Sequence, residues 1–370
     1  MRLHKPMQNL CIERQSRTGI MGLEHPLKND ICEKPRGKRN LITDVPGVAV
    51  GHVTLNRGNE KTGVTAILPQ PDHLFSQKLP AASQVINGFG KSIGLVQIDE
   101  LGTLETPILL TNTFAVGTAG TALVRYMLGQ NPDIGDTTGT VNPVVLECND
   151  GYLNDIRAMP VLEQHALEAL QNAGSGFEEG AVGAGTGMRC YGLKGGIGSS
   201  SRLIALNNGK TYTLGCLVLS NFGVMRDLTI GGDAVGRRLS RERKLPEEKG
   251  SIIVVLATDL PLSDRQLKRI CRRASVGITR TGSFIGNGSG EIAVAFSTAN
   301  RVAHYEKRDI VPVTQLSENR INDIFRMTAS VVEESILSSL VHAKTTEGRG
   351  GRVCLDLKTA LKQAGTAILK

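Results

Sequence analysis

Residues 249–257 read Lys249-Gly250-Ser251-Ile252-Ile253-Val254-Val255-Leu256-Ala257, a glycine and a serine followed by an unbroken apolar run. A charged stretch that contains Pro246 precedes them, which predicts a solvated loop that ends at Gly250 and a buried strand that begins at Ser251. Glycine accepts strained backbone geometry that other residues resist. A serine hydroxyl can attack the preceding carbonyl, and cleavage would leave Ser251 with a nucleophilic hydroxyl beside a free α-amine. This stretch is therefore either a self-cleavage site or an ordinary junction between loop and strand.

The composition is that of a globular protein with a substantial core. The chain has 370 residues, of which 40% are hydrophobic, and no apolar run is long enough to cross a bilayer. The basic first residues are not followed by an apolar stretch, so we expect neither a secretory signal nor a membrane partner. The seven cysteines are dispersed without a CxxC pair, which favours reduced thiols, a cytoplasmic location and no cysteine-based metal site.

The positive charge is concentrated at the start of the chain. The net charge is +8, and residues 1–40 contribute nine Lys or Arg and four Asp or Glu to it. A basic tail with Pro and Gly predicts a poorly ordered N-terminal extension over residues 1–40, with one folded domain over residues 41–370. Aromatic residues make up only 4% of the chain and Trp is absent, so we expect no nucleic-acid partner.

Hydrophobic periodicity predicts a mixture of strands and helices. Strand-like runs cover a strand pair within residues 42–55 and the stretches 92–98, 108–111, 144–146, 213–219, 251–258 and 291–297. Helical spacing appears over 161–170, from a plausible N-cap at Ser263 to Ala274, and over 316–342. Strands interspersed with helices, without regular alternation, indicate an α+β fold in which helices cover sheets.

The glycine-rich centre of the chain suggests a phosphate-binding loop at first sight. Gly183, Gly185 and Gly187 are spaced as GxGxG, however, and neither GxGxxG nor GxxxxGK[ST] occurs here. We therefore interpret the segment as tight turns and close backbone packing.

Ser289 and Glu291 lie at the start of another apolar strand, after a glycine-rich turn. Two residues apart on an extended segment, their side chains face the same way. Such a pair could hold or relay a proton beside a nucleophile, and the alternative is a polar hairpin edge.

Asn221 and the stretch after residue 146 complete the set of candidates. Asn221 ends an apolar strand, where its amide could stabilise an oxyanion or simply cap a turn. Glu147 and Tyr152 lie among carboxylates and amides after a buried run. A carboxylate there could bind a substrate ammonium group and the phenol could donate a hydrogen bond, although an Asn-Asp-Gly turn with solvated acids is the alternative.

Together these segments resemble one family. From about residue 41 to residue 366 the chain is similar to the DmpA family of N-terminal-nucleophile serine hydrolases, of the peptidase family P1 type, which contains L-aminopeptidases/D-esterases and β-peptidyl aminopeptidases. The matching stretches are 42–48, 104–113, 149–155, 183–188, 194–198 and 288–291. Several ordered matches are more specific than any single motif.

The resemblance implies a four-layer αββα sandwich, of the type shared with ornithine acetyltransferases. It implies self-cleavage between Gly250 and Ser251 into parts 41–250 and 251–370, which stay together and assemble into a homotetramer. Ser251 would be the nucleophile, Ser289 and Glu291 would assist its proton transfer, and Asn221 would bind the oxyanion. Tyr152 would lie near the scissile group and Glu147 near the substrate amine.

The expected activity is hydrolysis of short peptides, amides or esters with a free amino terminus, through an acyl-enzyme and without a metal or other cofactor. The general base stays open between the new α-amine and the Ser289–Glu291 pair. Two other functions remain as alternatives: an acyltransferase of the ornithine acetyltransferase type, whose members cut themselves at a threonine, and a non-catalytic binding protein on the same fold.

Overall fold

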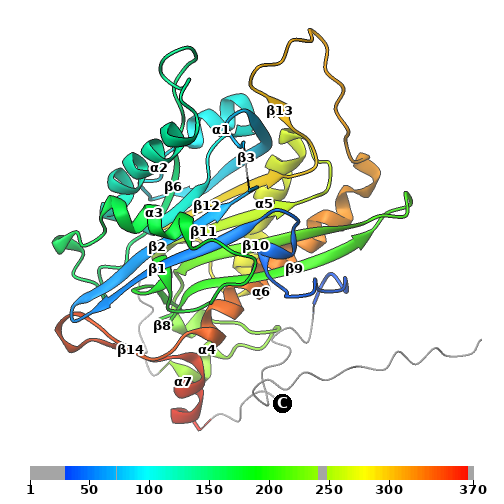
Figure 1. Cartoon of the computed structure of the whole chain (residues 1–370). Helices are drawn as coiled ribbons and strands as arrows, with labels where there is room; N and C mark the ends of the chain where they lie inside the picture. The colour runs from blue at the N-terminus through cyan, green and yellow to red at the C-terminus, as the bar shows by residue number, and fades with distance from the viewer. Residues whose placement is uncertain (1–29, 72, 241–247, 366–370) are drawn as a thin grey trace, which may run out of the picture.

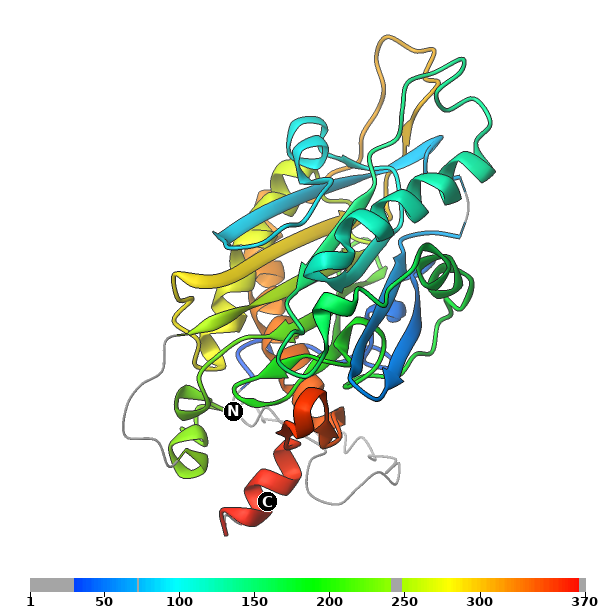
Figure 2. The same ribbon diagram turned by 90° about the vertical axis from the view of Figure 1, so that its left-hand side faces the viewer.

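Two β-sheets packed face to face form the centre of the molecule, and helices cover both outer faces (Figures 1 and 2). The computed structural model describes residues 30–71, 73–240 and 248–365. The smaller sheet has the strand order β1 (Ala49–Arg57), β2 (Glu60–Leu68), β5 (Ile108–Asn112) and β6 (Val144–Cys148). The larger sheet has the order β13 (Val302–Ala303), β3 (Gln77–Gly88), β12 (Gly288–Ser297), β11 (Lys249–Thr258), β10 (Thr211–Asn221) and β9 (Gly196–Ala205), and β4 (Thr103–Leu104) pairs with β3.

The helices divide between the two outer layers. Helices α2 (Val116–Gln130) and α3 (Glu163–Gln171) pack on the smaller sheet, and α5 (Asp264–Arg280) and α6 (Ile321–His342) pack on the larger one. Short elements complete the fold: α1 (Leu95–Leu101), α4 (Gly236–Leu239), α7 (Leu357–Gln363), β7 (Arg189–Cys190), β8 (Leu193–Lys194), β14 (Thr346–Glu347) and β15 (Val353–Cys354).

Strand β11 shows why its sequence is apolar throughout. Ile252, Val254 and Leu256 pack toward α5 and α6, whereas Ile253 and Val255 lie in the core between the two sheets. A strand buried on both faces needs apolar residues at successive positions instead of an alternating pattern. The layers α, β, β and α confirm the predicted α+β, four-layer αββα sandwich.

Most predicted elements occur where expected, and two do not. The run 92–98 was predicted as a strand, but the helix α1 occupies Leu95–Leu101. A short apolar run does not distinguish a strand from a one-turn or two-turn helix. The predicted strand pair within 42–55 is also wrong, because Ile42–Asp44 is a 3₁₀ turn and β1 pairs with β2 instead. Ser263 caps α5 as predicted, since its hydroxyl accepts from the N–H of Gln266.

The glycine-rich centre is a closely packed backbone, as predicted. A Cβ atom on Gly187 would lie 2.1 Å from the carbonyl oxygen of Lys61. The ammonium group of fully buried Lys194 donates to the carbonyls of Gly185, Met188 and Gly195 at 2.8–2.9 Å. The segment therefore packs closely against the core between the two sheets.

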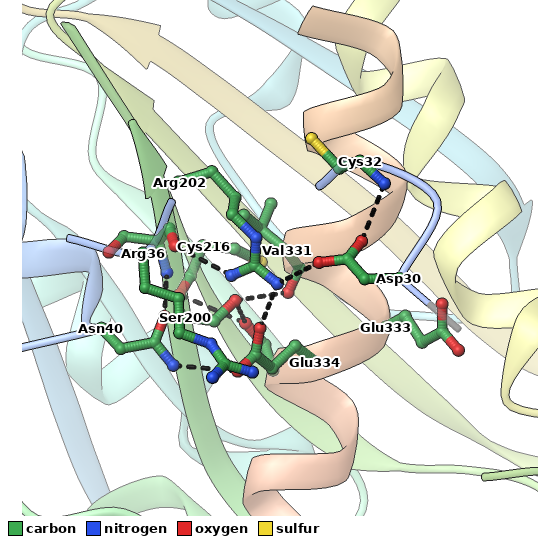
Figure 3. A network of polar contacts seen from close by, with 12 residues as sticks. Asp30, Cys32, Arg36, Asn40, Ser200, Arg202, Cys216, Val331, Glu333 and Glu334 are labelled. Carbon is green, nitrogen blue, oxygen red and sulfur yellow. Dashed lines mark hydrogen bonds and ion pairs between the residues drawn. The ribbon is translucent and has the colours of Figure 1, made fainter. Parts of the chain in front are cut away.

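The described part of the N-terminal extension is tied to the domain (Figure 3). The guanidinium of Arg202 on β9, with only 1% of its side chain exposed, pairs with Asp30 at 2.7 Å and with Glu334 of α6. Arg36 pairs with Glu334 at 2.9 Å, and Asn40 accepts from the N–H of Ser201 at 3.0 Å. Residues 30–40 thus pack against β9 and α6, and residues 1–29 lie outside the described residues.

Candidate active site

Four of the predicted site residues, Asn221, Ser251, Ser289 and Glu291, lie on three neighbouring strands of the larger sheet. Asn221 is the last residue of β10 and stands directly opposite Ser251 on β11. On the other side, β12 runs parallel to β11, and its register aligns Ser289 with Gly250 and Gly290 with Ser251. Ser251, only 5% exposed, therefore lies between Asn221 and the Ser289–Glu291 pair.

The side chains of Ser251 and of the Ser289–Glu291 pair leave the sheet on opposite faces. Ser251 alternates with Ile252 and faces the core between the sheets, where its hydroxyl lies beside the Cys148 thiol of β6. Ser289 and Glu291 share the face of Ala293, which is turned toward the helices α5 and α6. The pair therefore lies on the helix-facing side of the sheet, near the backbone nitrogen of Ser251 and away from its hydroxyl.

Ser289 and Glu291 form a buried hydrogen-bonded pair, with the same orientation that their spacing predicts. The Ser289 hydroxyl donates to Oε1 of Glu291, and both side chains are fully buried. Oε2 of Glu291 is buried and accepts no hydrogen bond from the described residues. Burial raises the pKa of Glu291 to about 7, the Ser289 hydrogen bond opposes this rise, and the nearby Glu248 adds to it. Oε2 of Glu291 can thus accept a hydrogen bond on the helix-facing side of the sheet, next to Ser251.

Asn221 is held rigidly by its two neighbours. Its Oδ1 accepts from the backbone N–H of Arg189 at 2.9 Å, and its Nδ2 donates to the carbonyl of Asn149 at 3.0 Å. These two bonds fix which end of the amide is the donor. An amide NH₂ carries two hydrogens, so one N–H remains for another acceptor next to Ser251.

Glycine is the residue type that the backbone at position 250 requires. Its φ is +154°, and a Cβ atom there would lie 2.1 Å from the carbonyl oxygen of Asn221 and 2.9 Å from the Cα of Phe222. A side chain at this position would clash with β10 and separate it from β11 next to the Ser251–Asn221 pair. The glycine is therefore required by a close backbone approach in addition to its torsion angle.

We expect Gly250→Ala to slow or abolish cleavage at this bond, because the added methyl group displaces the carbonyl that Ser251 would attack. The time course of chain cleavage after expression, followed by denaturing electrophoresis, measures this. Gly117→Ala in α2, where an added Cβ meets no atom within 4 Å, is the matched control. Cleavage of Gly250→Ala at the rate of the Gly117→Ala control would contradict the role of Gly250.

Glu147 lies at the end of β6, on the β12 side of Ser251. It is 4% exposed, its Oε1 accepts from the N–H of Lys91 at 2.9 Å, and its Oε2 accepts from the Thr113 hydroxyl. A Cβ on Gly90 would lie 3.5 Å from Oε1, and a Cβ on Gly290 would lie 2.4 Å from the carbonyl of Phe89. The loop over residues 88–91 therefore connects Glu147 with the strand beside Ser251.

Tyr152 lies on the other side, beyond Asn221. It is 41% exposed, and the guanidinium of Arg189 stacks on its ring at 3.7 Å from the centroid. Arg189 is also the residue whose N–H holds Asn221. Arg189 thus connects Tyr152 to Asn221, the residue predicted to bind the oxyanion.

Three residues near the site were missed or left aside by sequence reasoning. Burial raises the pKa of the Cys148 thiol well above its ordinary value, and the Ser251 hydroxyl opposes this rise. Burial also raises the pKa of Asp150 to about 7, and Asp150 accepts from Asn154 at 3.0 Å within the turn that carries Tyr152. Arg189 acts on Asn221 through its backbone, so no property of its side chain could have indicated it.

Neither a metal cluster nor a membrane helix is found in the part of the chain that the structure describes. No group of three or more His, Cys, Asp or Glu side chains there could hold a metal ion. Among the same residues, no helix combines the length and the apolar character that crossing a membrane requires.

Comparison with known families matches residues 40–354 to the model described as peptidase family S58. The chain belongs to peptidase family S58. The predicted resemblance to the DmpA group is thereby confirmed, with S58 instead of P1 as the family description. A curated relative, the β-peptidyl aminopeptidase BapA of Sphingosinicella microcystinivorans, is 38% identical over 363 residues, which cover 90% of each chain.

Solved structures agree with the S58 assignment. The PH0078 protein of Pyrococcus horikoshii matches with a TM-score of 0.85 and 51% identity, covering 90% of this chain and 95% of that one. The L-aminopeptidase D-Ala-esterase/amidase of Ochrobactrum anthropi, described as a variant of the Ntn hydrolase fold, matches with a TM-score of 0.82 and 35% identity. The match covers 94% of this S58 chain and all of the Ochrobactrum chain, which confirms the fold.

Proposed function

We propose that the chain cuts itself between Gly250 and Ser251, and that Ser251 then hydrolyses short peptides, amides or esters that carry a free amino terminus. Membership of S58, with relatives named as aminopeptidases, makes the chain a hydrolase of the aminopeptidase type. The observation that carries the proposal is the position of Ser251, between Asn221 and the Ser289–Glu291 pair on three adjacent strands.

The cleavage step breaks the peptide bond between Gly250 and Ser251. Ser251 Oγ attacks the carbonyl carbon of Gly250, the C–N bond breaks, and the nitrogen of Ser251 takes up a proton to become an amine. Water then hydrolyses the resulting ester and releases the Gly250 carboxylate. Asn221 lies opposite Ser251, so its second side-chain N–H would donate to the carbonyl oxygen as negative charge develops there.

The positions of these side chains on the two faces of the sheet favour the new α-amine as the general base of the mature site. The Ser251 hydroxyl and the Ser289–Glu291 pair lie on opposite faces of the sheet, with the backbone nitrogen of Ser251 between them. The amine can therefore accept the hydroxyl proton on one side and bind the Ser289–Glu291 pair on the other. Ser289 and Glu291 then hold and orient the resulting ammonium group.

In substrate hydrolysis, Ser251 attacks the scissile carbonyl and Asn221 stabilises the oxyanion. The amine of the leaving group takes its proton from the α-ammonium, and water attacks the acyl-enzyme to complete hydrolysis. Glu147 would bind the substrate ammonium from the β12 side. Tyr152 would donate a hydrogen bond near the scissile group from the β10 side.

The sheet explains how the two fragments would remain together. Strand β12 and the part of β11 from Ser251 onward belong to the second fragment, yet they pair with β3 and β10 of the first. Cutting one bond at the start of β11 leaves these ladders in place. Assembly into a homotetramer and a cytoplasmic location stay predictions from the sequence.

A comparison of aminoacyl p-nitroanilides with a free amine and with an acetylated amine tests the proposal. We expect hydrolysis of the free amines without any added acyl acceptor, and none of the acetylated compounds. Turnover that requires an added amine acceptor would instead support an acyltransferase. An uncut chain that turns over neither compound would support a binding protein.

A further inference from the structure

Two arginines converge on the Tyr152 ring at the rim of the site. The guanidinium carbon of Arg189, at the start of β7, lies 3.7 Å from the ring centroid, and that of Arg352, just before β15, lies 5.2 Å from it. Arg352 also donates to the carbonyl of Tyr152 at 3.0 Å. Cation–π contacts and this hydrogen bond hold both groups in place although their charges repel each other.

The arginine pair has no carboxylate partner in the described ranges. Neither Arg189 nor Arg352 forms an ion pair there, whereas other arginines do, among them Arg36, Arg202, Arg280 and Arg349. The neighbouring Asp155 faces Arg349 at 3.9 Å, and Asp150 is buried inside the turn, where it accepts from Asn154. Among the described residues, no carboxylate therefore pairs with the positive charge of the cluster of Arg189, Tyr152 and Arg352, which lies at a partly exposed surface.

The cluster lies on the side of Ser251 opposite to Glu147. Arg189 donates its N–H to Asn221, on the β10 side of Ser251, whereas the loop that holds Glu147 contacts Gly290 on the β12 side. A substrate with its ammonium at Glu147 and its scissile carbonyl at Ser251 would extend its leaving group toward Tyr152. An anion on that leaving group would meet the two guanidinium groups.

We propose that Arg189 and Arg352 bind the free C-terminal carboxylate of a short peptide substrate. This inference rests on the proposed function and names its substrate class: di- and tripeptides with both termini free. Guanidinium groups match the planar carboxylate with paired hydrogen bonds, and stacking on a tyrosine ring fixes their orientation. The site would thus recognise both charged ends of a short peptide, on either side of the nucleophile.

The test compares kcat/KM for a dipeptide and for the same dipeptide with an amidated C-terminus. We expect the wild-type protein to favour the free acid about tenfold, and Arg189→Gln and Arg352→Gln each to reduce this ratio about threefold. Arg352→Lys should retain part of the preference. Arg125→Gln, at an exposed ion pair with Glu163 on the smaller-sheet side, is the matched control and should keep the full ratio.

The outcomes separate this inference from the proposed function. Hydrolysis of both peptides with a ratio near one in the wild type, or with a ratio that neither glutamine variant changes, would overturn the carboxylate site and leave the aminopeptidase intact. If neither peptide is hydrolysed, the proposed function fails, and calorimetric binding of the dipeptide still decides the inference. A weaker Kd in Arg352→Gln would support it, and an equal Kd in Arg352→Gln and wild type would overturn it.

Discussion

Ser251→Ala is expected to yield one continuous chain without peptidase activity. In the proposed mechanism, removal of the hydroxyl eliminates the group that attacks Gly250 and also the group that forms the acyl-enzyme. Loss of a serine nucleophile typically lowers kcat by a factor on the order of 10⁶. Denaturing electrophoresis should show two bands for the wild type, for residues up to 250 and from 251 onward, and one band for the variant.

A serine on the outer surface provides the control for Ser251→Ala. Ser275 lies on α5, and its hydroxyl donates only to the carbonyl of Arg272 in the same helix. Ser275→Ala should be cut and active like the wild type. A Ser251→Ala protein that is still cut at the same bond, or that retains more than a trace of turnover, would show that another group is the nucleophile.

Asn221→Ala is expected to lower kcat by about 10²- to 10³-fold, equivalent to about 2.7–4 kcal/mol in barrier height. Asn221 stands opposite Ser251 in the strand register, and in the proposed mechanism its lost N–H acts on the transition state, so KM should change much less than kcat. Cleavage of the precursor should slow as well, because the proposed cleavage passes through an oxyanion at the same place. Steady-state kinetics on an aminoacyl p-nitroanilide measure the first effect.

Asn221→Asp refines this test. The aspartate can still accept the N–H of Arg189, but it places a negative charge where the oxyanion forms, so its kcat should fall at least as far as that of Asn221→Ala. Asn319→Ala, on an exposed turn before α6, serves as the control. A kcat for Asn221→Ala within about threefold of the Asn319→Ala value would remove Asn221 from the oxyanion site.

Local sequence patterns predicted the strands that carry the site but not their mutual register. The glycine-serine junction before an apolar run located β11, and the two-residue spacing of Ser289 and Glu291 placed both on one face. The position of Ser251 relative to this pair depends on the parallel pairing of β11 with β12. That pairing joins segments almost 40 residues apart, and no local pattern encodes it.

Contacts between distant segments explain why the described part of the N-terminal extension differs from its prediction. The sequence predicts a solvated extension up to residue 40, yet Asp30 and Arg36 pair with Arg202 and Glu334, which are distant in sequence. Each charge taken alone is typical of a surface, and only the fold brings them together. The same holds for Arg189 and Arg352, whose shared contact with Tyr152 arises from three separate segments of the chain.

Determination of the amino-terminal sequences in purified, active protein tests the central claim most directly. The account predicts two polypeptides in equal amounts, with the second beginning Ser-Ile-Ile-Val-Val at Ser251. Mass spectrometry of the intact protein should find a fragment of residues 251–370 to match. Full activity in a protein whose chain is continuous across Gly250 and Ser251 would contradict it.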